Sequence, residues 1–279
     1  MSLLDASQIS RFHRDGYLLG PNVVDRASLE TLRAELDRVI EQRDRADVPQ
    51  PTRVSNLGGD ESHPVWQIVN IWLASDAFRH LLNIEGLGEA MQALIGGDHI
   101  RLWHDQVQYK PKDIGGTTAW HQDWPYWPTM SQPNAVTAWI ALDDADADNG
   151  CMSMVPGSHR WGNAITHLHT IKGISEMPAS WDGRDTPARL CPVPAGAVHF
   201  HHSLTWHGSH NNTSARPRRA IALHFMNEQV RKNPGDQHLC SRYCESADGE
   251  PISGARFPLI WSDGAPRTAA AVKPEPALA

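Results

Sequence analysis

The sequence predicts an all-β core, a sandwich or a barrel, with helical additions that brace it from the N-terminal side. Residues 98–230 form short apolar segments separated by glycine, proline, asparagine and aspartate, which is the pattern of strands joined by turns. Residues 1–97 instead carry apolar side chains at helical spacing. All-β domains often reach this length, so we expect residues 1–264 to form a single domain. The Pro- and Ala-rich residues 265–279 are expected to be a disordered tail.

Three helical segments are expected before the β core. Asp5 is a suitable N-cap for a short helix, and Gly16 ends that helix just before an apolar edge strand. An amphipathic helix of about four turns follows Asp25, with leucines on one face and arginines and glutamates on the other. Residues 76–95 are expected to form a further helix. The polar residues 43–61 between these helices are expected to be a loop or a mobile lid.

Five strands are expected in the second part of the chain. They are residues 100–110, 135–142, 151–155, 196–207 and 219–225. The polar insertion at residues 159–189 has no clear secondary-structure pattern and is a second candidate for a lid.

Composition narrows the function classes. The net charge of -7 lacks the basic surplus that nucleic acids and anionic membranes attract, so neither is an expected partner. No stretch approaches the roughly 18 apolar residues of a membrane span, and we expect a cytoplasmic location. The four cysteines are too few and too irregularly spaced for a disulfide framework, so they are expected to be reduced thiols.

Two histidines and one aspartate are the candidate metal ligands. In an extended strand His121 and Asp123 would point to the same side, and His207 could join them from a later strand. Two histidines and a carboxylate on one face of Fe(II) leave the other face open, as in non-haem iron oxygenases. Gly208 after the third ligand would allow a tight turn at the metal.

Other histidines compete with His207 for the third position. His201 shares its strand face, but six residues of extended chain span about 20 Å, which predicts that both cannot reach one ion. We therefore expect His199, His201 and His202 to pack or to form hydrogen bonds, with the substrate channel as the alternative for one of them. His210 and His224 are also expected to be structural.

An arginine and three aromatic residues complete the candidate site. Arg218 could bind the far carboxylate of a 2-oxo acid through its planar guanidinium, with Arg216 and Arg219 as the competing positions. A surface salt bridge is the alternative role for any of the three arginines. Lining of a substrate pocket is proposed for Trp124, Tyr126 and Trp127, which follow the ligand pair directly, with core packing as the alternative for the tryptophans.

Taken in order, these motifs resemble the phytanoyl-CoA dioxygenase family of Fe(II)- and 2-oxoglutarate-dependent oxygenases. The motifs are Tyr109-Lys110-Pro111, Trp120-His121-Gln122-Asp123, Asn149-Gly150-Cys151, Pro156-Gly157-Ser158-His159, His207-Gly208-Ser209 and Arg218-Arg219-Ala220. They cover most of the chain. The resemblance implies a double-stranded β-helix, a cupin-like jelly roll.

The resemblance also implies cofactors and roles. It implies His121, Asp123 and His207 as iron ligands and Arg218 as the 2-oxoglutarate clamp. It further implies that Trp139, Ser209 and Gln108 contact this co-substrate, and that O2 is the second co-substrate. Related halogenating enzymes have a small residue in place of the carboxylate, so Asp123 favours hydroxylation of an unactivated C–H bond or an oxidation built on it.

The expected function is therefore a dioxygenase that oxidises a small molecule or natural product and releases succinate and CO2. One alternative is a non-catalytic barrel that only binds a metal and a 2-oxo acid. Another is zinc-dependent hydrolysis with the same three ligands, which would leave Arg218 without a role.

Overall fold

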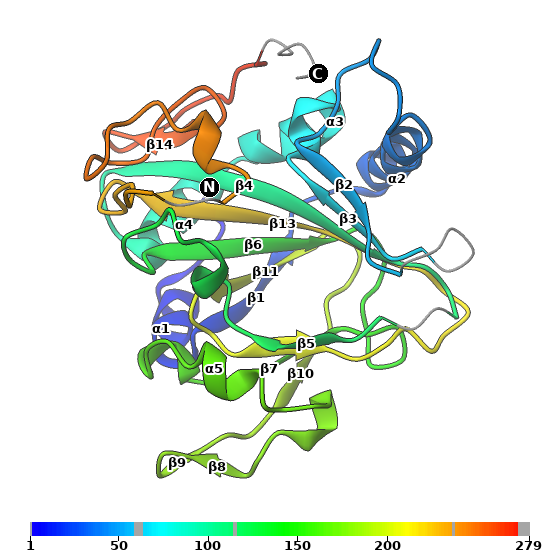
Figure 1. Cartoon of the computed structure of the whole chain (residues 1–279), viewed down its shortest axis with the longest axis vertical. Coiled ribbons are helices and arrows are strands. Elements are labelled where there is room, and N and C mark those ends of the chain that lie inside the picture. The colour runs from blue at the N-terminus through cyan, green and yellow to red at the C-terminus, as the bar shows by residue number, and fades with distance from the viewer. Residues whose placement is uncertain (1, 59–63, 114–115, 236–237, 273–279) are drawn as a thin grey trace.

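The computed structural model describes residues 2–58, 64–113, 116–235 and 238–272, and two facing antiparallel sheets form its centre (Figure 1). The larger sheet contains β1 (Tyr17–Asn22), β2 (Arg53–Asn56), β3 (Trp66–Val69), β4 (His99–Lys110), β6 (Ala135–Ala141), β11 (Ala197–His202), β13 (Arg218–Asn227), β14 (Leu259–Ser262) and β15 (Ala265–Pro266). Its order is β1-β11-β6-β13-β4-β14-β15, while β3 pairs with both β2 and β4.

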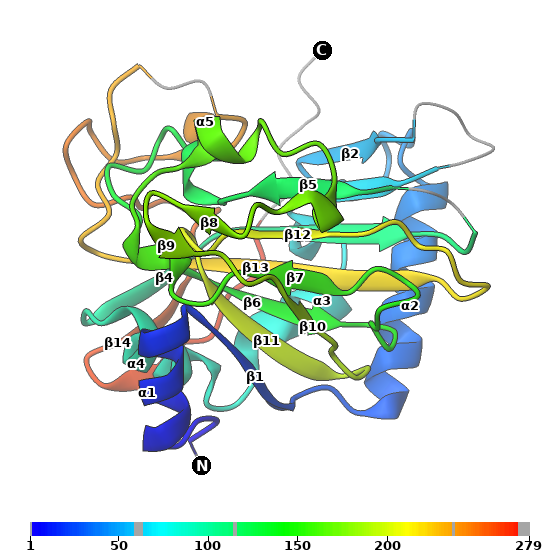
Figure 2. The same cartoon turned by 90° about the horizontal axis from the view of Figure 1, so that it is seen from below.

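The smaller sheet has the order β10-β7-β12-β5. It consists of β5 (Thr118–His121), β7 (Met152–Met154), β10 (Arg189–Cys191) and β12 (His207–Ser209). Seen from below, this sheet lies in front of the larger one, and a hairpin of β8 (Ser180–Trp181) and β9 (Arg184–Asp185) lies on its outer side (Figure 2). The two facing sheets form the double-stranded β-helix that the resemblance implied.

Helices α1 (Ala6–Asp15), α2 (Arg26–Glu41), α3 (Asp76–His80) and α4 (Leu87–Ile95) pack on the outer face of the larger sheet. The short helix α5 (Ile165–Leu168) instead contacts β5 of the smaller sheet. The short 3-10 helices are η1 (Ile71–Leu73), η2 (Leu81–Asn83), η3 (Trp124–Tyr126), η4 (Ser158–Arg160), η5 (Ile174–Glu176) and η6 (Ser241–Tyr243). The side chain of Asp5 caps α1, and Gly16 ends it with a left-handed φ of 82°, as the sequence predicts.

Successive side chains of each strand point to opposite faces of the larger sheet. Along β13, Ile221, Leu223 and Phe225 are fully buried in the core shared with α1 to α4. The intervening residues, including Ala222 and His224, face the smaller sheet. The small side chains at Ala220 and Ala222 leave room between the sheets, where the functional site lies.

Several sequence predictions differ from the structure. Residues 76–95 are not one helix, because Gly86 has a φ of 77° and separates η2 from α4. Residues 196–207 are not one strand: β11 ends at His202, a turn follows, and β12 starts at His207 in the other sheet.

Two regions predicted to lack regular structure contain strands. Residues 43–61 include β2, while residues 59–61 lie outside the described part. The tail prediction is wrong for residues 265–272, since β15 pairs with β14 and the amide of Ala269 donates to Asn83 Oδ1 at 2.9 Å. Residues 273–279 lie outside the described residues.

Candidate metal centre and co-substrate site

The structure brings the three candidate metal ligands together between the sheets. His121, the last residue of β5, lies directly opposite His207, the first residue of β12, and their ring centroids are 4.0 Å apart. The Asp123 Oδ1 atom is 3.6 Å from His121 Nε2 and 3.5 Å from His207 Nε2. Among the described residues, this is the one group of His, Cys, Asp or Glu with three ligand atoms within 4.8 Å of one another.

Backbone hydrogen bonds orient both imidazoles for a metal. His121 Nδ1 lies 2.8 Å from the carbonyl oxygen of Ala119, and His207 Nδ1 lies 2.9 Å from that of Thr205. A carbonyl oxygen only accepts, so Nδ1 carries the proton in each ring and Nε2 presents its lone pair toward Asp123. This is the tautomer that a metal-binding histidine needs.

The other oxygen of Asp123 is held by the larger sheet. Its Oδ2 accepts from Thr137 Oγ1 at 3.2 Å and lies 3.3 Å from His201 Nε2. Burial opposes ionisation of this carboxyl, but its contacts with His207, His121 and His201 hold its pKa well below the usual range. Asp123 is therefore an ionised carboxylate with one oxygen anchored and one directed at the two histidines.

Two local predictions about the ligands are corrected. The strand ends at His121, and Asp123 has helical backbone angles (φ -73°, ψ -49°), with its backbone N–H donating to the carbonyl oxygen of Ser203 at 2.9 Å. Gly208 is a strand residue and makes no turn: a Cβ there would lie 2.9 Å from the carbonyl oxygen of Thr118. Glycine is required because β5 passes close to it.

Only one of the three candidate arginines lacks an acidic partner among the described residues. Arg219 makes a bidentate pair with Asp143 at 2.8 and 2.9 Å, and the exposed Arg216 pairs with Asp146 at 2.6 Å. Arg218 is 1% exposed, and its Nε and Nη1 atoms have no hydrogen-bond partner. Burial lowers its pKa to about 10, so the guanidinium stays charged at neutral pH.

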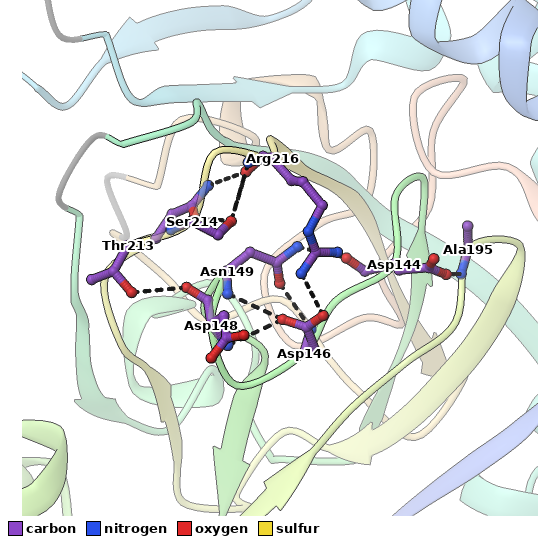
Figure 3. A network of polar contacts seen from close by, with 9 residues as sticks. Asp144, Asp146, Asp148, Asn149, Ala195, Thr213, Ser214 and Arg216 are labelled. Carbon is purple, nitrogen blue, oxygen red and sulfur yellow. Dashed lines mark hydrogen bonds and ion pairs between the residues drawn. The ribbon is translucent and has the colours of Figure 1, made fainter.

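The Arg216 pair belongs to a network that braces the loop before Arg218 (Figure 3). Asp146 Oδ1 accepts from the amides of Asp148 and Asn149, and Thr213 Oγ1 donates to the carbonyl oxygen of Asp148 at 3.1 Å. These bonds tie the β6–β7 loop to the β12–β13 loop. The carboxylate of Asp146 is thus neutralised by Arg216, which has a structural role.

Sequence reasoning missed a second buried basic residue beside Arg218. Lys110 lies opposite Arg218 in the β4–β13 pairing, is 3% exposed, and donates to Ser209 Oγ at 2.7 Å and to the carbonyl oxygen of His210 at 2.8 Å. Burial and then the charge of Arg218 lower its pKa to about 6. Alternate side chains of a strand lie on the same face, so Lys110 lies on the same face of β4 as Gln108. This alternation was the sequence signal that could have identified Lys110.

A cavity of about 880 Å³ extends from the candidate metal ligands to Lys110. Its inner end is lined by Lys110, Gln108, Trp139, Ser209 and Met152. Arg218 does not line it but lies behind Trp139, with the guanidinium carbon 5.6 Å from the indole centroid. Trp139 Nε1 is also buried without a hydrogen-bond partner.

The outer part of the cavity contains predicted and unpredicted residues. Tyr126 and Trp127 line it, whereas Trp124 does not: its Nε1 donates to the Met130 carbonyl oxygen at 3.2 Å. His201 and His224, expected to be structural, line the cavity as well, and so does His104.

The remaining histidines of the sequence prediction lie elsewhere. Neither His199 nor His202 lines the cavity. His199 stacks on Tyr17 with 5.8 Å between ring centroids, and His202 Nδ1 accepts from the amide of Leu204 at 3.1 Å.

A double-stranded β-helix with two histidines, one carboxylate and an unpaired buried arginine defines the class of non-haem iron enzymes that use a 2-oxo acid. The family model for phytanoyl-CoA dioxygenase matches residues 12–220. The chain belongs to this family of iron- and 2-oxoglutarate-dependent dioxygenases, and iron, 2-oxoglutarate and O2 are its cofactor and co-substrates.

Known relatives differ in their substrates. The chain is 30% identical over 174 residues to a probable alpha-ketoglutarate-dependent hypophosphite dioxygenase of Stutzerimonas stutzeri, covering 60% of this chain and 59% of that protein. It is 27% identical to the peroxisomal phytanoyl-CoA dioxygenase of Mus musculus, covering 80% of this chain and 69% of that one. A solved non-heme alpha-ketoglutarate-dependent carbocyclase from nogalamycin biosynthesis has a TM-score of 0.71 at 27% identity, covering 92% and 96% of the two chains.

No helix in the described residues is both long and apolar enough to cross a membrane.

Proposed function

We propose that the protein oxidises a C–H bond of a small organic molecule, with His121, Asp123 and His207 holding Fe(II). The observation that supports this assignment most strongly is the protonation state of the three side chains. Both histidines direct an unprotonated Nε2 toward the ionised Oδ1 of Asp123. Such a set of two neutral nitrogens and one carboxylate oxygen suits Fe(II) and leaves coordination positions open.

We further propose that the buried donors at the inner end of the cavity hold 2-oxoglutarate. Arg218 Nε and Nη1 and Trp139 Nε1 are donors without an acceptor, and Lys110 is a buried amine without a carboxylate partner. Buried donors normally have partners, and a buried guanidinium next to a buried lysine favours an anion between them. Ser209 and Gln108 line the same end and can add hydrogen bonds to its carboxylate.

When bound, iron and 2-oxoglutarate supply the oxidising chemistry, in which O2 is consumed, succinate and CO2 are released, and the substrate gains an oxygen atom. The protein positions the metal, the co-substrate and the substrate relative to one another. Thr137 and His201 fix the orientation of Asp123, and the cavity places a substrate beside the ligands, away from bulk water.

The alternatives are a binding protein without turnover and a zinc hydrolase. Both would use the same three ligands. A zinc hydrolase gives no role to Lys110 and Arg218, which an anionic co-substrate would use, whereas a binding protein for a 2-oxo acid would use both residues in the same way. Hydroxylation is the default outcome, because the carboxylate ligand Asp123 is present.

Anaerobic titration of the protein with Fe(II) and 2-oxoglutarate tests the assignment. We expect the weak visible charge-transfer band of the iron chelate in the native protein and its loss in the Asp123→Ala protein. Asp146→Ala is the matched control, since that carboxylate pairs with Arg216 outside the site and should leave the band intact. Iron binding without a band would contradict the proposal and favour a metal-binding or hydrolytic protein.

A further inference from the structure

A row of polar side chains crosses the cavity face of the larger sheet. His104, His224, Thr137 and His201 come from β4, β13, β6 and β11, and each is the direct cross-strand partner of the next. His104 is 3% exposed and His224 is 4% exposed, and both line the cavity. The proposed metal site and co-substrate site use neither of them.

The hydrogen bonds along this row decide which nitrogen of each ring carries the proton. The Asp123 carboxylate can only accept, so Thr137 Oγ1 donates to it and must accept from His224 Nδ1, 2.8 Å away. His104 Nδ1 lies 3.1 Å from the carbonyl oxygen of Asp105 and therefore donates to it. In both rings the network assigns the proton to Nδ1 and the lone pair to Nε2.

These two Nε2 atoms are acceptors without a donor in the described part of the chain. The rings are neighbours, with centroids 4.7 Å apart. Burial lowers the pKa of His224 to about 4. Burial and the neighbouring His224 lower the pKa of His104 well below its usual range, so both rings are uncharged near neutral pH. Because both residues line the cavity, a bound ligand can supply the donors for these two acceptors.

The charges around the outer cavity also limit the ligand. Of the described lining residues other than histidines, Asp123 is the one acidic residue, and the inner Lys110 and the exposed Arg53 are the basic residues. A carboxylate or phosphate would meet two lone pairs and no buried cation, and an ammonium would find no carboxylate apart from the proposed metal ligand. A purely apolar ligand would leave both lone pairs unsatisfied.

An aromatic surface adjoins the two acceptors. The Trp127 ring is 5% exposed and lies 4.9 Å from His224 and 5.8 Å from His104, centroid to centroid. Tyr126 lies on the His121 side, with its hydroxyl 2.8 Å from His169 Nε2. This side of the cavity therefore combines a flat apolar surface with two hydrogen-bond acceptors. Such a combination can orient a ring compound.

We propose that the substrate is an uncharged ring compound with hydroxyl groups on neighbouring carbons, which donate to His104 Nε2 and His224 Nε2 while the molecule packs against Trp127. This inference rests on the proposed function, since it assigns the outer part of the same cavity. His224 is linked to Asp123 through Thr137, so a hydroxyl bound there holds its ring beside the proposed metal ligands.

Three matched probes test this chemistry on the anaerobic protein loaded with Fe(II) and 2-oxoglutarate. The reference probe is phenyl β-D-glucopyranoside. Its tetra-O-methyl ether keeps the ring but has no hydroxyl donors, and phenyl β-D-glucuronide keeps the ring but carries a negative charge. The chelate band is recorded first, so failure of the proposed function is seen before any probe is added. By calorimetry we expect the glucoside to bind about tenfold more tightly than either analogue.

Variants then locate the binding. His104→Phe keeps a ring but removes the acceptor, and we expect it to weaken glucoside binding about tenfold while leaving 2-oxoglutarate affinity unchanged. His80→Phe, an exposed histidine at the end of α3, is the matched control and should change neither affinity. With the band intact, the proposal is overturned by absent glucoside binding, by equal binding of the ether or the glucuronide, or by an unaffected His104→Phe protein.

Discussion

His201 Nε2 lies 3.3 Å from Asp123 Oδ2, although the proposed metal ligand His207 is six positions further along the chain than His201. The chain turns between them, with the Thr205 amide donating to the carbonyl oxygen of His202 at 2.9 Å, and passes from the larger sheet to the smaller one. The rings of His201 and His207 are consequently 4.7 Å apart. His201 thus holds the carboxylate whose other oxygen faces the two ligand histidines.

Replacing His201 should weaken iron binding without removing a ligand. In His201→Phe the Asp123 carboxylate loses one of its two side-chain anchors, and partners of this kind typically contribute ten- to a hundredfold to metal affinity. Competition with a chromophoric Fe(II) chelator would measure the change. His202→Phe removes the adjacent histidine, which does not touch Asp123, and should retain native affinity; equal affinity in the two variants would exclude this positioning role.

The same turn explains one error of sequence reasoning. A continuous strand over residues 196–207 placed His201 and His207 about 20 Å apart. That distance holds only if both residues are in one extended strand, and local patterning does not reveal that Ser203 to Trp206 leave the sheet. The backbone N–H of Asp123 donates a hydrogen bond to the carbonyl oxygen of Ser203, so a contact distant in sequence stabilises the turn.

Features set by neighbouring residues were predictable. The Asp5 cap, the Gly16 helix end and the strand around Val107 follow from short-range rules. The sequence also proposed His121, Asp123 and His207 as one group, and their ligand atoms lie within 4.8 Å of one another. The row that joins His104, His224 and Thr137 was not predictable, because it depends on the register of three strands. A shift of one residue in any strand would turn its member away from the cavity.

Lys110 and Arg218 should both contribute to 2-oxoglutarate affinity. Lys110→Met keeps the length of the side chain but removes its charge, and Arg218→Ala removes the unpaired guanidinium. Hydrogen bonds to charged groups predict an increase of roughly ten- to a hundredfold in the 2-oxoglutarate Kd for each variant. Anaerobic titration of the chelate band measures it. Arg216→Ala is the control, since that arginine pairs with Asp146 at the surface (Figure 3); an unchanged Kd for Lys110→Met would remove this lysine from the site.

Binding of 2-oxoglutarate should take up a proton near neutral pH. Without an anion the pKa of Lys110 is about 6, so the amine is mostly neutral at pH 7.5. A carboxylate beside it favours the charged form and raises this pKa, so protein with bound co-substrate holds the extra proton. Calorimetry in two buffers with different ionisation enthalpies should show uptake at pH 7.5 that declines as the pH falls below 6. Lys110→Met should abolish the uptake; a native protein without any uptake would contradict the prediction.

Asp105 should stabilise the fold rather than the reaction. It is fully buried, and its carboxylate accepts from the amides of Ile71 at 2.8 Å and Trp72 at 3.1 Å, which start η1 beneath β4. Asp105→Ala leaves both amides without an acceptor, and we expect a loss of about 2–4 kcal/mol in the free energy of unfolding, measured with urea. Asp105→Asn keeps one acceptor oxygen and should lose less.

The pH dependence distinguishes this role from a simple loss of volume. Burial raises the pKa of Asp105 to about 7 in the folded protein, above its value in the unfolded chain. Its stabilising contribution is therefore complete at acidic pH and declines as the pH rises through 7. Asparagine does not titrate, so the stability difference between the native and Asp105→Asn proteins should narrow from pH 5 to pH 8. Urea unfolding of both proteins at these two pH values measures the difference, and a gap that stays constant with pH would show that Asp105 is ionised in the folded state across this range.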